Sequence, residues 1–182
     1  MTMVTEIFVS VDVETSGPIP GEYSLLSIGA CRVDDPEVTF ACELKPLNRN
    51  ADPEALAVTG LSLDVLSQRG LAPQMAMQHF DAWLMAGITA DETPVFVGLN
   101  APFDWSFVNY YFHRFLGRNP FGFTALDIKA YFMGAIGCRW SDTRSSQIAN
   151  FVNVNSAGNH NALIDAQYQA KLFRLLRDRS KS

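Results

Sequence analysis

The chain has 182 residues, of which 48% are hydrophobic, 18% are charged and 12% are aromatic. This composition suffices for the core of one globular domain and excludes a disordered chain, so we expect a single domain over residues 1–182. The formal net charge of −5 excludes an extensive basic surface, but it does not exclude a nucleic-acid partner held at a few phosphates, because acids that bind divalent cations become locally positive.

The first part of the chain predicts three consecutive strands. Residues 7–13 alternate apolar with small or polar side chains, which predicts a strand that carries Asp12 near its end. Residues 25–33 and 38–44 predict two further strands. The short connection over 34–36 joins them, so they should be antiparallel neighbours.

Helices dominate the rest of the chain. Asp52 and Asp127 each precede a predicted helix, where an aspartate is a common N-terminal cap. Three antiparallel strands followed by alternating strands and helices indicate an α/β fold, in which a central mixed five-stranded sheet is flanked by helices. The remaining predicted elements are strands over 94–98 and 123–126 and helices over 73–85, 102–116, 143–151 and 161–177, the last after a loop over 153–159.

The cysteines and the N-terminal segment indicate the compartment. Cys31, Cys42 and Cys138 are an odd number without close spacing, which favours neither a disulfide framework nor a zinc knuckle. The N-terminus lacks the basic segment of a secretion signal, and no apolar run approaches the roughly 18 residues that a membrane span requires. We therefore expect a cytoplasmic protein that has no membrane partner.

Acidic residues occur where the predicted elements would let them meet. Asp12 and Glu14 flank one residue at the end of the first strand, so both side chains can face the same side of the sheet. Asp104 falls in the first turn of a predicted helix, at the sheet edge where α/β sites collect. His160 lies in the loop before the last helix, and Asp165 lies on that helix.

Each of these residues also has an ordinary structural explanation. Acidic strand ends, carboxylates that complement a helix dipole and surface loop histidines are all common. Four clustered carboxylates, however, raise one another's pKa and destabilise the fold unless a counter-charge is present. Divalent cations supply that charge, and a set of oxygen ligands favours Mg²⁺ or Mn²⁺ over zinc.

Three short motifs make the chain resemble a known family. Asp-Val-Glu-Thr-Ser-Gly begins at Asp12, Asn-Ala-Pro-Phe-Asp ends at Asp104, and His-Asn-Ala-Leu-Ile-Asp-Ala begins at His160. In this order and spacing they resemble the DEDDh subgroup of the DEDD superfamily of 3′-5′ exonucleases, which includes proofreading exonucleases, ribonuclease T and oligoribonuclease. The resemblance covers about residues 6–176 and implies a ribonuclease H-like fold.

The resemblance implies a two-metal-ion mechanism. Asp12, Glu14 and Asp165 would hold one Mg²⁺ or Mn²⁺ ion, while Asp12 would also bridge to a second ion that Asp104 helps to position. Two such ions clamp the attacking and leaving oxygens of an in-line displacement. His160 would take the proton of the attacking water, since an imidazole pKa of about 6.5 suits a general base. The expected products are nucleoside 5′-monophosphates from the 3′ end of single-stranded DNA or RNA.

The resemblance also implies contacts with the terminal nucleotide. Residues 54–61 are similar to the family segment that packs against this nucleotide, although Thr59 and Leu99 each replace a histidine common in relatives. Phe103 and Phe107 could stack on bases, but their helical spacing is also explained by core packing. The implied substrate contacts are Val13, Thr15, Thr59, Gly60, Leu61, Asn100 and Phe103.

Two classes of function remain open at this point. A catalytically silent module with the DEDDh fold would bind nucleic acid or protein, but it would lack a metal ligand or the base, and all five positions are filled here. Within the enzyme class, a proofreading subunit competes with an RNA-trimming enzyme. Several relatives are dimers, so a homodimer is one expected state, whereas no segment indicates a polymerase partner.

Overall fold

The computed structural model describes residues 5–155 and 160–179, so residues 156–159 of the predicted loop lie outside it. Five strands form one mixed sheet in the order β3-β2-β1-β4-β5. The central strand β1 pairs antiparallel with β2 and parallel with β4, which confirms the predicted arrangement. The strands are β1 (Thr5–Thr15), β2 (Leu25–Arg32), β3 (Thr39–Glu43), β4 (Glu92–Gly98) and β5 (Ala125–Asp127).

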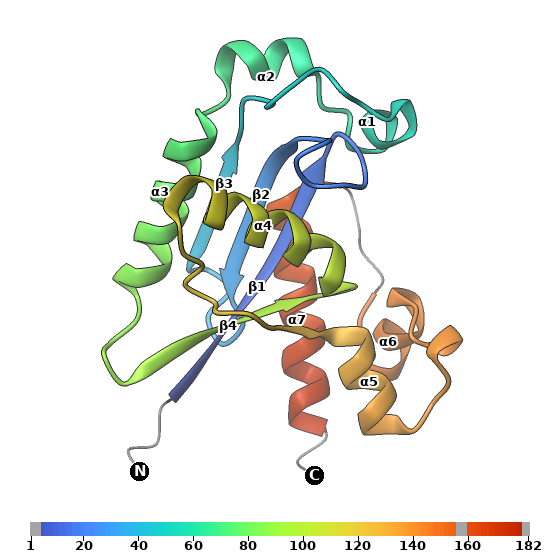
Figure 1. The fold of residues 1–182 in the computed structure, drawn as a ribbon. Helices are drawn as coiled ribbons and strands as arrows, with labels where there is room; N and C mark the ends of the chain where they lie inside the picture. The colour runs from blue at the N-terminus through green and yellow to red at the C-terminus, as the bar shows by residue number, and fades with distance from the viewer. Residues whose placement is uncertain (1–4, 156–159, 180–182) are drawn as a thin grey trace.

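Helices cover both faces of the sheet (Figure 1). The helices α3 and α4 pack on one face, and α5, α6 and α7 pack on the other. None of the helices within the described ranges is long and apolar enough to cross a membrane. The helices are α1 (Pro53–Thr59), α2 (Leu63–Arg69), α3 (Pro73–Ala86), α4 (Ala101–Leu116), α5 (Ile128–Ile136), α6 (Ser145–Val152) and α7 (Ala162–Arg179), with a short 3-10 turn η1 (Trp140–Asp142).

The alternation of side chains along β1 decides which face receives the acids. Val9, Val11 and Val13 are buried in the core beneath α3 and α4. Because successive strand residues point to opposite faces, Asp12 and Glu14 face the side on which α7 packs. The sheet therefore keeps its apolar stripe on one side and presents two carboxylates on the other.

Two aspartates cap helices as predicted. The Asp52 carboxylate accepts a hydrogen bond from the Glu54 backbone N–H at 2.9 Å, at the start of α1. The two oxygens of Asp127 accept from different helices: Oδ1 accepts from Ala130 N–H of α5 and Oδ2 from Ala101 N–H of α4, both at 2.7 Å. Asp127 is thus a structural cap, and it joins the beginnings of two helices.

The structure corrects two predicted boundaries. The strand expected over 123–126 begins only at Ala125, because Gly122 turns the chain with a φ of 76° and leaves Phe123 89% exposed. The segment after Asp52 forms two helices, since Gly60 ends α1 in a left-handed conformation and Ser62 caps α2.

Candidate active site

The end of β1 holds the first two candidate residues on neighbouring positions of one face. Asp12 pairs with Gly29 of β2, and Glu14 pairs with Ser27. Neither carboxylate is fully buried, so both remain accessible from the side of α7.

A glycine on β2 allows α7 to reach these acids. A Cβ at Gly29 would lie 2.1 Å from the backbone carbonyl carbon of Ala162, the first residue of α7, which is closer than side chains tolerate. The helix therefore begins directly against the strand partner of Asp12, and Asp165 follows within its first turn. The sequence analysis missed Gly29, because its role depends on a contact between segments that are distant in sequence.

The helix α4 delivers the third acid from the other side of β1. Asp104 lies in the first turn of α4 and is only 5% exposed. Its Oδ1 accepts a hydrogen bond at 3.0 Å from the backbone N–H of Val13, the residue between the two acids of β1. Asn100 adopts a left-handed conformation immediately before this helix, with a φ of 67°. The predicted position of Asp104 in the first helical turn is confirmed.

The predicted base lies beside two of the acids. Ligand atoms of Glu14, His160 and Asp165 all lie within 4.8 Å of one another. His160 is exposed and has a φ of 54°, two residues before α7 begins. Asn161 caps that helix, since its side-chain oxygen accepts from Ile164 N–H at 3.2 Å. The imidazole is therefore attached to the entry of the helix that carries Asp165.

The carboxylates share one electrostatic environment. Burial raises the pKa of Asp12 well above its usual range, and Asp104, Glu14 and Asp165 raise it further. Burial, with Asp165 adding to it, raises the pKa of Glu14 to about 7, and burial raises the pKa of Asp104 to about 8. Such mutual repulsion is relieved by a bound divalent cation, and the all-oxygen set of carboxylates suits Mg²⁺ or Mn²⁺. The donor set of this structure fits the metal that the sequence predicts.

Gln169 organises the site from α7 and was not found by the sequence analysis. Its Oε1 accepts from the Leu99 backbone N–H at 2.9 Å, and its Nε2 donates to Asp12 Oδ1 at 2.6 Å. A backbone N–H can only donate, so the contact with Leu99 fixes the orientation of the amide and turns its NH₂ group toward the carboxylate. Gln169 is 4% exposed, and this one side chain links β1, the turn after β4 and α7.

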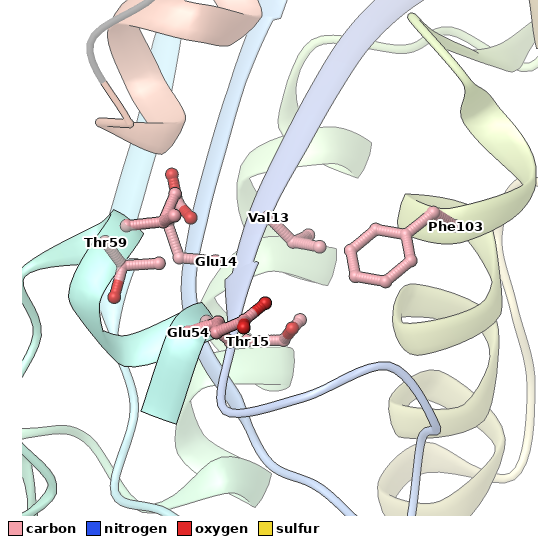
Figure 2. A pocket seen from close by; sticks show the side chains of 8 residues that line it. Val13, Glu14, Thr15, Glu54, Thr59 and Phe103 are labelled. Atoms are coloured by element: carbon pink, nitrogen blue, oxygen red, sulfur yellow. The ribbon is translucent and has the colours of Figure 1, made fainter. Parts of the chain in front are cut away.

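A pocket of about 270 Å³ opens beside Glu14. Figure 2 shows it between α1, which presents Glu54 and Thr59, and α4, which presents Phe103, with the end of β1 between them. Four of the predicted substrate contacts line it: Val13, Thr15, Thr59 and Phe103. Glu54, Ala55 and Val58 also line it and were predicted only as part of the segment over 54–61.

The other predicted substrate contacts are not part of the lining of this pocket. Gly60 forms the left-handed end of α1, and Leu61 follows it, with its N–H donating to Thr59 Oγ1 at 3.2 Å. Asn100 is exposed before α4. Phe107 is fully buried in the core, so of the two phenylalanines only Phe103 reaches the pocket.

The sequence matches a family model described as exonuclease over residues 9–173. The chain belongs to the exonuclease family. The match extends from β1 into α7 and includes all five predicted catalytic positions. Enzymes of this family depend on divalent metal ions, and the ligand atoms of Glu14, His160 and Asp165 are close enough to one another to hold one.

A curated relative and two solved structures are similar to this exonuclease. It is 57% identical over 171 residues to the Escherichia coli protein 3′-5′ DNA exonuclease Cap18, with 94% of this chain and 91% of that protein covered. The nuclease domain of 3′hExo, a DEDDh family member bound to rAMP, has a TM-score of 0.73 at 15% identity, with 94% and 92% covered. Escherichia coli Exonuclease I in complex with a dT13 oligonucleotide has a TM-score of 0.75 at 16% identity, with 97% of this exonuclease and 42% of that chain covered.

These relationships confirm the predicted family and fold. The protein is a 3′-5′ exonuclease that resembles the DEDDh group, and its mixed five-stranded sheet is of the ribonuclease H-like type.

Proposed function

We propose that this exonuclease hydrolyses the terminal phosphodiester bond of single-stranded DNA by a two-metal-ion mechanism and releases nucleoside 5′-monophosphates. The observation that carries the proposal is the convergence of Asp12, Glu14, Asp104 and Asp165 on one site beside His160. Three of these acids have a raised pKa, chiefly because they are buried and in part because the carboxylates repel one another, and bound divalent cations would offset both effects.

The acids divide between the two proposed ions as follows. Glu14 and Asp165 lie close enough together to hold one ion, which Asp12 would also help to hold, and Asp104 would help to hold a second. Two bound ions would activate a water and stabilise the leaving 3′ oxygen. His160, within 4.8 Å of Glu14 and Asp165, would accept the proton of that water.

The pocket beside Glu14 would receive the terminal nucleotide. Phe103 forms an apolar wall on one side, and Thr59 lies on the opposite side. An aromatic ring at this point can stack on any base, which suits an enzyme that removes nucleotides regardless of sequence. The preference for DNA is supported by the name of the relative that is 57% identical.

The test is a time course on single-stranded DNA and RNA oligomers that carry a label at the 5′ end. With Mg²⁺ or Mn²⁺ we expect a ladder that shortens from the 3′ end, with monophosphate products and faster removal from DNA. EDTA should stop the reaction. The matched control is the Asp104→Asn protein, which keeps the size of the side chain and removes its charge. A catalytically silent binding module would retain the oligomers without shortening them in any of these conditions.

A further inference from the structure

A second and larger groove, of about 730 Å³, lies along α4 beyond the catalytic end of this helix. Its α4 residues recur at intervals of three and four, so they form one face of the helix. Pro20, from the connection between β1 and β2, closes the groove on one side. The lining includes Trp105, Ser106, Tyr110, His113 and Arg114.

The groove and the nucleotide pocket take lining residues from the same two segments of the chain. Phe103 lines the pocket and Ser106, one helical turn later, lines the groove. Thr15, the last residue of β1, lines the pocket, and Pro20, in the connection that follows β1, lines the groove. That connection lies directly on the groove, because a Cβ at Gly21 would lie 2.7 Å from the hydroxyl oxygen of Tyr110.

The side chains of the groove combine aromatic rings with positive charge. The Arg114 guanidinium lies over the Tyr110 ring, 5.6 Å from its centroid, and donates a hydrogen bond to its hydroxyl. Within the part of the chain that the structure describes, Arg114 forms no ion pair, whereas Arg118 pairs with Asp81 at 2.7 Å. A cation that lacks an acidic partner and lies beside half-buried aromatic rings is suited to a phosphate between two bases.

We propose that this groove binds the nucleotides that precede the 3′ end of the same DNA strand. Tyr110 and Trp105 would contact bases, and Arg114 would contact a phosphate. The proposal rests on the proposed function, since it requires the 3′ end to lie in the pocket beside Glu14. The rise of an α-helix places Arg114 about 16 Å along α4 from Phe103, so only strands of several nucleotides would reach it.

His113 and Arg114 lie in the last turn of α4, where basic side chains also stabilise the helix by complementing its dipole. That effect changes the stability of the protein but is independent of the length of the substrate. The length dependence of catalysis therefore separates strand binding from helix stabilisation.

The first experiment compares kcat/KM on a twelve-nucleotide DNA strand with kcat/KM on a dinucleotide. We expect the ratio of the two values to fall by about tenfold in Arg114→Gln, the effect of one charge-assisted contact. Arg118→Gln is the matched control, since it removes the same charge four residues later, and its ratio should equal that of the wild type. Equal ratios in all three proteins would overturn the proposal, as would an equal fall in both variants.

The second experiment measures binding of a fluorescent twelve-nucleotide strand in EDTA, so that its outcome does not depend on hydrolysis. The slope of log affinity against log salt concentration should decrease by about 0.7 in Arg114→Gln, the value for one phosphate contact of a single strand. The slope of Arg118→Gln should equal that of the wild type. An unchanged slope in Arg114→Gln would show that Arg114 contacts no phosphate of the strand, and it would overturn the proposal. Failure of the proposed function would instead appear as wild-type protein that binds DNA but never shortens it.

Discussion

The side-chain amide of Gln169 donates a hydrogen bond to Asp12 while its carbonyl oxygen accepts one from the backbone of Leu99, so one residue of α7 determines how a carboxylate of β1 is oriented. An amide that holds a metal-binding carboxylate in place commonly changes metal affinity by about 10- to 100-fold when it is removed. This contact gives the first prediction.

Gln169→Leu should weaken Mn²⁺ binding by at least about tenfold, because Asp12 loses the donor that orients it. The measurement is a titration of Mn²⁺ followed by electron paramagnetic resonance, together with Tm and kcat. Gln167→Leu is the matched control, since Gln167 lies on the same helix and donates to the Pro36 carbonyl oxygen, away from the acids. If both variants lose Tm equally and both retain wild-type Mn²⁺ affinity, Gln169 has only a structural role.

His160→Ala should lower kcat by about 10²- to 10⁴-fold, the usual contribution of a general base. Because we assign the proton to His160 and the metal to carboxylates, Mn²⁺ affinity should change by less than about threefold. His79→Ala, an exposed helical histidine, provides the control. Loss of Mn²⁺ binding in His160→Ala would show instead that the imidazole is a metal ligand, which its distance from Glu14 and Asp165 would allow.

Gly29→Ala should destabilise the protein by about 1–3 kcal/mol and reduce exonuclease activity, because the added methyl group would displace the beginning of α7 and Asp165 with it. Gly134→Ala is the control, since a Cβ at Gly134 meets no atom within 4 Å and alanine is favoured in the interior of α5. Thermal unfolding measures the first effect, and initial rates measure the second. A Gly29→Ala protein with unchanged Tm and rate would contradict the close approach of α7.

The stability of the metal-free protein should fall as pH rises. Burial raises the pKa of Glu14 to about 7 and that of Asp104 to about 8, above their values in the unfolded chain of about 4. Between the unfolded and folded pKa values, the folded protein therefore binds more protons than the unfolded chain. The free energy of unfolding that these groups contribute at low pH is lost as pH rises through their folded pKa values of about 7 and 8.

The measurement for this prediction is Tm in EDTA between pH 5.5 and pH 8.5. Asp104→Asn should show a smaller fall than the wild type, whereas Asp142→Asn, at an exposed surface ion pair, should match the wild type. Mg²⁺ should raise Tm most at high pH, where it binds the deprotonated acids. A fall of the same size in Asp104→Asn and in the wild type would exclude Asp104 as its source.

The sequence was sufficient for the mixed five-stranded sheet and for the places of the acids in the chain, because each acid stands in a short motif at the end or beginning of a predicted element. Gln169 could not be found in this way, since no motif marks its neighbourhood on α7. It lies one helical turn after Asp165, and this position brings its side chain to Asp12. Gly29 was hidden for a similar reason, because it matters only where α7 meets β2. Exposed Phe123 was assigned to a strand because apolar character alone does not distinguish a turn from a buried strand.

The two oxygens of Asp127 hold the first backbone N–H of α4 and an N–H of α5 at the same time. A single carboxylate thus ties the beginnings of these two helices together. Insertions among the exposed residues 122–124 should therefore leave the geometry around Asp104 intact, whereas loss of Phe121, which is buried in the core beneath α4, should not.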